Sequence, residues 1–193
     1  MKYNLENIIA KMKELGYTVF ENDKKNYNIN IVGIRTNDMT ANTFNDWLFV
    51  FWKYNGKWFL KQYPITTDPG TYYRLHPMNK KGTWIMAPAQ NKGCYQLGTY
   101  HGDYALVQIA PMYGYRDADR DNILEPVGEL LHENAGTFIH LAGKNSFTVD
   151  NWSAGCQVFK SEANGLDFFG ICKLAAEIYG NTFTYTLLNE TQL

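Results

Sequence analysis

The chain has 193 residues, of which 45% are hydrophobic, 16% aromatic and 19% charged. This length suggests one domain, or one domain with a small appendage, and the apolar fraction excludes wholesale disorder. The net charge of −1 predicts no general attraction to nucleic acid or anionic membranes, and the longest apolar run, residues 47–52, is far too short to span a bilayer.

The chain begins with a helical pattern. Apolar residues between positions 5 and 15 recur at helical spacing, with Asn4 as a suitable N-cap and Gly16 as a suitable end. Residues 17–20 then resemble a short strand, 21–27 a loop and 28–35 a second strand. The pattern changes near residue 28, so we divide the chain into a helical extension, 1–27, and a β-rich domain, 28–193.

Two aromatic strands follow, at 47–54 and 57–64. The dipeptide Asn55-Gly56 between them is a strong hairpin signal, because both residues tolerate positive φ. Residues 66–79 have no regular pattern. Shorter strands are expected at 83–87, 94–99, 104–110, 138–141 and 157–159.

The last fifth of the chain predicts a helix and a closing strand. Leu166, Phe169, Cys172, Leu174 and Ile178 would share the apolar face of the helix, which Gly180 would end, and residues 182–188 alternate as a strand does. The predicted fold class is therefore mainly β, with helices at both ends. The high aromatic content agrees, since aromatic side chains suit pleated, half-buried surfaces.

The amino terminus has no apolar signal core, so we expect synthesis in the cytoplasm unless a leader has been removed. The three cysteines are odd in number and far apart, which does not fit a disulfide framework. Cys94 and Cys172 lie in apolar patterns and are expected to be buried core thiols.

Cys156 is the candidate nucleophile. It ends the run Ser153-Ala154-Gly155-Cys156, whose small residues suit a tight turn that exposes a sulfur. The Gly155 and Cys156 amides could face an oxyanion, and His140, at the end of an apolar run, could supply an imidazolium that favours thiolate. The alternative is that both residues are structural, because free cysteine is often buried.

Residues 139–158 resemble the active-site signature of the L,D-transpeptidases (YkuD-type), cysteine enzymes of peptidoglycan. That signature has an apolar strand ending in His, a variable loop, and then Ser or Thr, His, Gly and Cys. The segments 82–90, 95–98, 104–108 and 115–117 are similar to a divergent branch of the family associated with phages and gut bacteria. The resemblance extends over residues 28–170 and is sharpest at His140 and Cys156.

The resemblance implies an L,D-transpeptidase-like β-sandwich or barrel in which Cys156 attacks peptidoglycan stem peptides, His140 is the base and the Leu141 carbonyl orients the imidazole. Ser153 would hydrogen-bond within the turn, and no cofactor would be required. Two positions differ: Ala154 replaces the family's second His, and Leu141 replaces a Gly.

The expected function is therefore a transpeptidase, carboxypeptidase or endopeptidase, phage-encoded or delivered to the cell wall. The alternative is a non-catalytic wall-binding or virion structural protein that keeps the fold. Oligomeric state is left open.

A second pattern is acidic. Asp117, Asp119 and Asp121 alternate like the first half of a calcium loop, although Gly128 stands at the twelfth position, where a bidentate Glu is usual. The sequence thus suggests a structural calcium site. The alternative is a surface turn whose carboxylates pair with Arg116 and Arg120.

Overall fold

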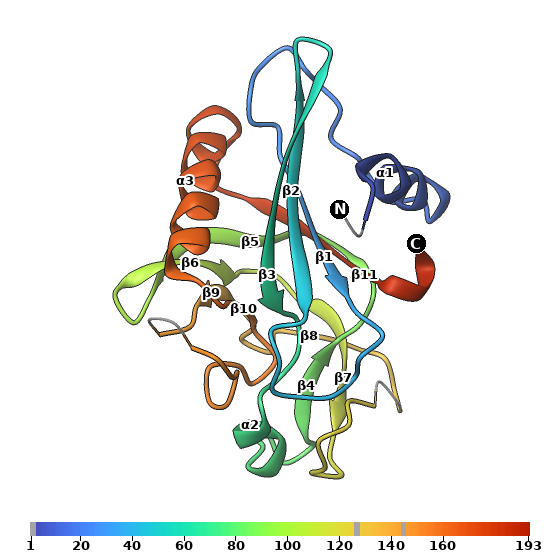
Figure 1. The fold of residues 1–193 in the computed structure, drawn as a ribbon, viewed down its shortest axis with the longest axis vertical. Helices are drawn as coiled ribbons and strands as arrows, with labels where there is room; N and C mark the ends of the chain where they lie inside the picture. Colours follow the sequence, from blue (N-terminus) through green and yellow to red (C-terminus); the bar gives the residue numbers. More distant parts are fainter. Residues whose placement is uncertain (1–2, 126–127, 144–145) are drawn as a thin grey trace.

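The computed structural model describes residues 3–125, 128–143 and 146–193, and within them the chain is mainly β (Figure 1). Eight of the described strands close a barrel, in which neighbours are β1 (Asn30–Arg35), β11 (Phe183–Asn189), β5 (Gln90–Tyr100), β6 (Asp103–Gln108), β9 (Ile139–Leu141), β10 (Gln157–Phe159), β3 (Lys57–Thr66) and β2 (Asp46–Tyr54). A separate sheet contains β4 (Thr83–Met86), β7 (Met112–Asp117) and β8 (Leu131–Glu133). In Figure 1 the strands β4 and β7 lie at the opposite end of the molecule from the tip of the β2–β3 hairpin.

The β2–β3 hairpin confirms the prediction from Asn55-Gly56. The two turn residues have φ values of 50° and 75°, and the strands pair in unbroken register from Asp46↔Ile65 to Tyr54↔Lys57. Positive φ at both positions matches the twist of the flanking strands, so local sequence alone specifies this turn.

Helices lie at both ends of the described chain, as predicted. Helix α1 (Leu5–Glu14) begins at Asn4, whose side chain accepts a hydrogen bond from the Glu6 amide at 2.8 Å. Its buried residues Ile8 and Met12 pack against the barrel in one hydrophobic cluster with Val32 of β1. A single 3₁₀ turn, η1 (Glu190–Gln192), ends the fold.

Helix α3 (Glu162–Tyr179) begins at Ser161 and ends at Gly180, whose φ is 91°. The predicted apolar face was wrong in part: Leu166, Leu174 and Ile178 are exposed. The helix is apolar on several sides, so spacing alone does not choose the buried stripe. Packing against the barrel decides which side of the helix is buried. The residues that α3 contributes to the core are Phe168, Phe169, Ile171, Cys172 and Ala175.

Residues 17–20 are not a strand, contrary to the prediction. Their backbone groups bond to side-chain amides instead of a neighbouring strand. Thr18 exchanges two hydrogen bonds with Gln90, at 2.8 and 2.9 Å, and Phe20 does so with Asn30, at 2.8 and 3.1 Å. These contacts satisfy the backbone locally, so no ladder is needed.

Four elements were missed from the sequence: β7, β8, the short helix α2 (Thr71–Leu75) and the turn η1. Gly114 interrupts the pattern of β7, yet it is required there, because a Cβ at this position would lie 2.2 Å from Cζ2 of Trp84. The residues that pack together are thus about thirty positions apart in sequence. None of the helices in the described residues is long and apolar enough to cross a membrane.

Candidate active site

Cys156 lies at the end of a tight turn that leads into β10. The Ser153 hydroxyl donates to the Cys156 carbonyl at 2.8 Å and accepts from the Gly155 amide at 3.1 Å, which is the hydrogen bonding expected of Ser153. Gly155 has a φ of 119°, and a Cβ there would lie 2.6 Å from the Trp84 carbonyl oxygen. Only glycine fits this position.

This turn corrects one expectation about the oxyanion donors. The Gly155 amide already bonds to Ser153, so it is not available to an oxyanion as the site stands. Within the described residues, the Cys156 amide makes no hydrogen bond. Of the two amides proposed from the sequence, Cys156 therefore supplies the available one.

His140 lies on β9, next to the strand that follows Cys156. The strands β9 and β10 are parallel, and His140 is the register partner of Val158. Because side chains alternate along a strand, His140 and Cys156 project on the same side of this pair, opposite the barrel core that contains Ile139 and Phe159. The topology thus brings together two residues that are 16 positions apart in sequence.

One nitrogen of the His140 ring is anchored. Nδ1 lies 2.8 Å from the Leu141 carbonyl oxygen, the contact that the resemblance implied. This carbonyl can only accept, so Nδ1 carries the proton and Nε2 is the basic nitrogen. Nε2 is buried and has no hydrogen-bond partner within the described part of the chain. The Tyr100 ring covers the imidazole, with 4.9 Å between ring centroids.

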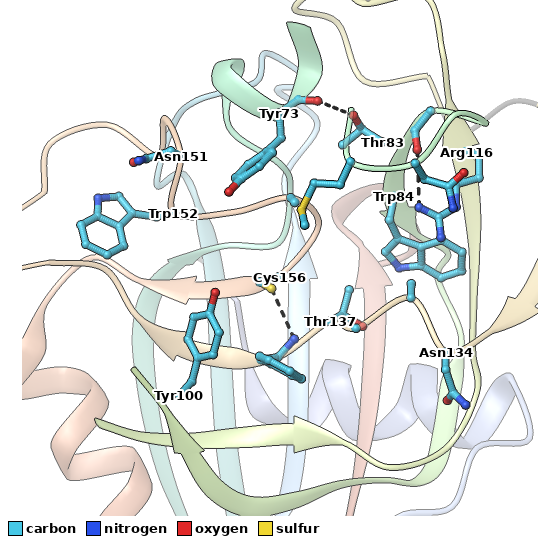
Figure 2. Close-up of a pocket in the computed structure, with 17 residues that line it drawn as sticks. Tyr73, Thr83, Trp84, Tyr100, Arg116, Asn134, Thr137, Asn151, Trp152 and Cys156 are labelled. Carbon is cyan, nitrogen blue, oxygen red and sulfur yellow. Dashed lines mark hydrogen bonds between the residues drawn. The ribbon is translucent and has the colours of Figure 1, made fainter. Parts of the chain in front are cut away.

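The two residues do not form a hydrogen bond with each other among the described contacts. The Cys156 sulfur instead accepts from the Phe138 amide at 3.4 Å, drawn as a dashed line in Figure 2. Cys156 lines the adjacent cavity, whereas His140 does not. The cavity therefore exposes the thiol but not the imidazole, whose Nε2 has no hydrogen-bond partner within the described residues.

Burial keeps both groups neutral, which corrects the expected imidazolium–thiolate pair. Desolvation raises the pKa of the Cys156 thiol to about 11, although the backbone amides of Phe138 and Ala154 oppose this. Burial, and to a smaller extent the nearby His101, lower the pKa of His140, against the opposing effect of the Leu141 and Trp152 carbonyls. At pH 7 a pKa near 11 corresponds to about one thiolate in ten thousand molecules.

The other two thiols are buried in the core, as predicted. Burial raises the pKa of Cys94 to about 12 and raises that of Cys172 well above its ordinary value. Of the three cysteines, Cys156 is the one that is not fully buried.

A cavity of about 460 Å³ opens over Cys156. Figure 2 shows Asn151 and Trp152 on one side of the sulfur, Trp84 and Arg116 on the other, and Tyr73 opposite Tyr100. The walls come from both sheets, from α2 and from the loops 134–138 and 151–154.

Sequence reasoning found only part of this wall. The aromatic residues Tyr73 and Trp152 line the cavity without any sequence signal that assigned them to it. Trp52 is not part of the wall, because it is buried and stacks on Phe59 with 5.6 Å between ring centroids. Trp84 and Arg116 lay within segments that resemble the family, but nothing in their spacing assigned them to the site.

Gln108 holds in place the loop 134–138, which lines one side of the cavity. Its Oε1 accepts from the amides of Gly136 and Thr137 at 2.9 and 3.0 Å, and its Nε2 donates to the carbonyls of Ala110 and Glu133 at 2.9 and 3.2 Å. The next residue along, Phe138, supplies the amide that contacts the thiol. A single amide side chain therefore joins β6 to the backbone beside the nucleophile.

The acidic turn surrounds an arginine that the sequence did not indicate. Asp117, Asp119 and Asp121 all pair with Arg74, whose side chain is fully buried. Arg116 pairs with Glu133 instead, so its expected pairing within the turn was wrong. Within the described residues, no group of three or more His, Cys, Asp or Glu side chains is arranged for a metal.

No protein-family model, curated protein or solved structure matches this chain.

Proposed function

We propose that the chain is a cysteine acyl-transfer enzyme that acts on peptidoglycan stem peptides, with a fold of the L,D-transpeptidase type. The observation that carries the proposal is the arrangement of Cys156 and His140. A thiol lines a cavity large enough for a peptide, and on the same face an imidazole is held by the Leu141 carbonyl with Nε2 unoccupied. A nucleophile, a base and a group that orients the base are the parts such chemistry requires.

In the proposed reaction, Nε2 of His140 removes the thiol proton as Sγ attacks the peptide carbonyl. The Cys156 amide donates to the developing oxyanion. The C–N bond then breaks, the departing amine takes the proton from His140, and an acyl-thioester remains on Cys156. An incoming amine completes transpeptidation, and water completes hydrolysis.

The neutral resting pair makes His140 a general base rather than the partner of a preformed thiolate. The proposal requires Nε2 and Sγ to come within hydrogen-bonding distance when substrate binds. Catalytic contacts that are long in a free enzyme commonly shorten in the complex.

The test is incubation with purified muropeptides, followed by mass spectrometry of the products. We expect the wild type to release an amine or an amino acid and Cys156→Ala to release none. His140→Ala should lower the rate by about 10²–10⁴-fold, the usual range for a positioned base. Cys94→Ala is the matched control, since that thiol is in the core, and it should retain activity.

A second function is a non-catalytic wall-binding or virion structural protein that keeps this fold. The high pKa of Cys156 and the Ala154 position favour it. In that case wild type and Cys156→Ala would bind muropeptides equally well, and neither would change their mass.

A further inference from the structure

Trp84 is held in a slot between two glycines. On one side, a Cβ at Gly114 would lie 2.2 Å from Cζ2 of the indole, and on the other, a Cβ at Gly155 would lie 3.0 Å from Cδ1. Neither position can therefore bear a side chain without moving the ring. The indole is 1% exposed, and its orientation is fixed by backbone on both sides.

The indole N–H of Trp84 has no acceptor. Nε1 is buried and makes no hydrogen bond within the described residues, although Trp84 lines the cavity. Nε1 is bonded to Cδ1, the atom that faces Gly155, so the donor lies on the side of the residue preceding the nucleophile. Buried donors are nearly always paired, so one left unpaired in a cavity wall indicates an acceptor on a ligand.

Arg116 lies over the ring of the same residue, with its guanidinium carbon 5.0 Å from the Trp84 ring centroid. It is the one charged residue among the described residues that line the cavity. Its Nε and Nη2 bond to a single oxygen of Glu133, and Nη1 makes one long contact, 3.4 Å, with the Gly82 carbonyl. Since a guanidinium has five N–H donors, two are left for a ligand.

We infer that Trp84 and Arg116 form a carboxylate-binding subsite beside Cys156. The wall offers a neutral indole donor and a cation with spare donors, and a carboxylate accepts from both at once. Resting on the proposed function, this subsite selects amide substrates whose carboxylate lies a few bonds from the carbonyl that Sγ attacks. Arg116 and Trp84 are thus specificity residues for the leaving side of the substrate.

The binding test uses the full chain with Cys156→Ala, so that no turnover occurs, labelled with ¹⁵N. The probes are N-acetylglycyl-D-alanine and its C-terminal amide, which differ only in the carboxylate. We expect the Trp84 indole resonance, assigned by its loss in Trp84→Phe, to shift downfield with the acid and to stay in place with the amide. Arg116→Gln should weaken binding of the acid by about tenfold or more, as the loss of a charge-assisted bond predicts.

Two matched variants serve as controls. Trp152→Phe changes an indole on the opposite side of the cavity, and Arg120→Gln removes an exposed cation outside it. Neither should change the preference for the acid. If Trp84→Phe fails to fold, the comparison of Arg116→Gln with Arg120→Gln still decides the case.

Any of three results would overturn the subsite. They are equal shifts of the Trp84 resonance with acid and amide, no shift with the acid, and an affinity of Arg116→Gln for the acid equal to that of the protein that keeps Arg116. The proposed function is judged separately, on the wild type. Binding of the acid without any turnover of muropeptides would leave the subsite standing and reject the enzyme. Turnover that is equally fast for acid and amide substrates would support the enzyme and reject the carboxylate subsite.

Discussion

The ionisation of Cys156 can be measured directly from its rate of alkylation. Only thiolate reacts with iodoacetamide, so the rate follows the thiolate fraction. Because burial raises the pKa of Cys156 to about 11, that fraction should rise about tenfold for each pH unit below this value. We therefore expect the labelling rate to increase about a hundredfold between pH 7 and pH 9.

The assay is peptide mapping by mass spectrometry after brief labelling across a pH series. An ordinary thiol, with a pKa near 8.5, would reach a plateau above pH 9, and a thiolate held by an imidazolium would label equally at pH 6 and pH 8. Cys94 and Cys172 serve as internal controls and should stay unlabelled until denaturant is added, when all three cysteines should titrate near 8.5. Because the resting imidazole is neutral, His140→Ala should leave the labelling profile within about threefold while lowering turnover by about 10²–10⁴-fold.

A pH-independent rate for Cys156 near neutrality would refute this reasoning. It would show that the thiol is ionised at rest, so that burial does not dominate its pKa. Labelling of Cys94 as fast as Cys156 would refute it in another way, because the accessible thiol would then not be the one in the cavity.

Three further predictions concern stability, measured by urea unfolding. Gly155→Ala should lower the free energy of unfolding by about 1–3 kcal/mol from backbone strain, and by more because the new Cβ would contact a backbone oxygen. The control Gly102→Ala has a φ of 92° but nothing within 4 Å of the new Cβ, so it should show the strain alone. Equal losses of stability in the two variants would contradict the role of the contact. Arg74→Met should lower the free energy of unfolding by about 3–5 kcal/mol, because it leaves the buried Asp117 carboxylate unpaired. Added calcium should leave the melting temperature of the wild type unchanged, and a rise would show that the acidic turn binds the ion. Desolvation and a neighbouring carboxylate raise the pKa of Asp46 to about 6 from 3.8, so the folded state binds its proton more tightly. Stability should therefore fall by up to about 3 kcal/mol as pH rises from 4 to 6, and Asp46→Asn should remove this slope.

The sequence predicted the parts of the fold that depend on nearby residues. Asn55-Gly56 specifies its hairpin through the φ values that these two residues accept, and Asn4 caps its helix through a bond to an amide two residues away. Such signals need no knowledge of the rest of the chain. The pairing of Nδ1 of His140 with the Leu141 carbonyl was instead implied by the resemblance to a known family, and the structure contains this contact.

The parts that were missed depend on distant residues. Trp84 and Gly114 each look ordinary alone, and only the pairing of β4 with β7 shows why one needs the other. The partner of the acidic turn, Arg74, lies more than forty residues earlier in the chain, so local charge pairing pointed to the wrong arginines. Burial had the largest effect, because it reversed the expected ionisation of Cys156 and His140, and no sequence pattern reports how deeply a strand end is covered.

The two sheets have different tasks in the proposed reaction. The ladder between β9 and β10 sets the positions of His140 and Cys156, whereas β4 and β7 carry Trp84 and Arg116. The sheets meet where Gly155 packs on Trp84, one residue before the nucleophile. A carboxylate bound by Trp84 and Arg116 would therefore lie next to the turn that positions the thiol. Because the resting thiol is protonated, the proposed reaction starts from a neutral Cys156 and relies on His140 to remove the proton during the attack.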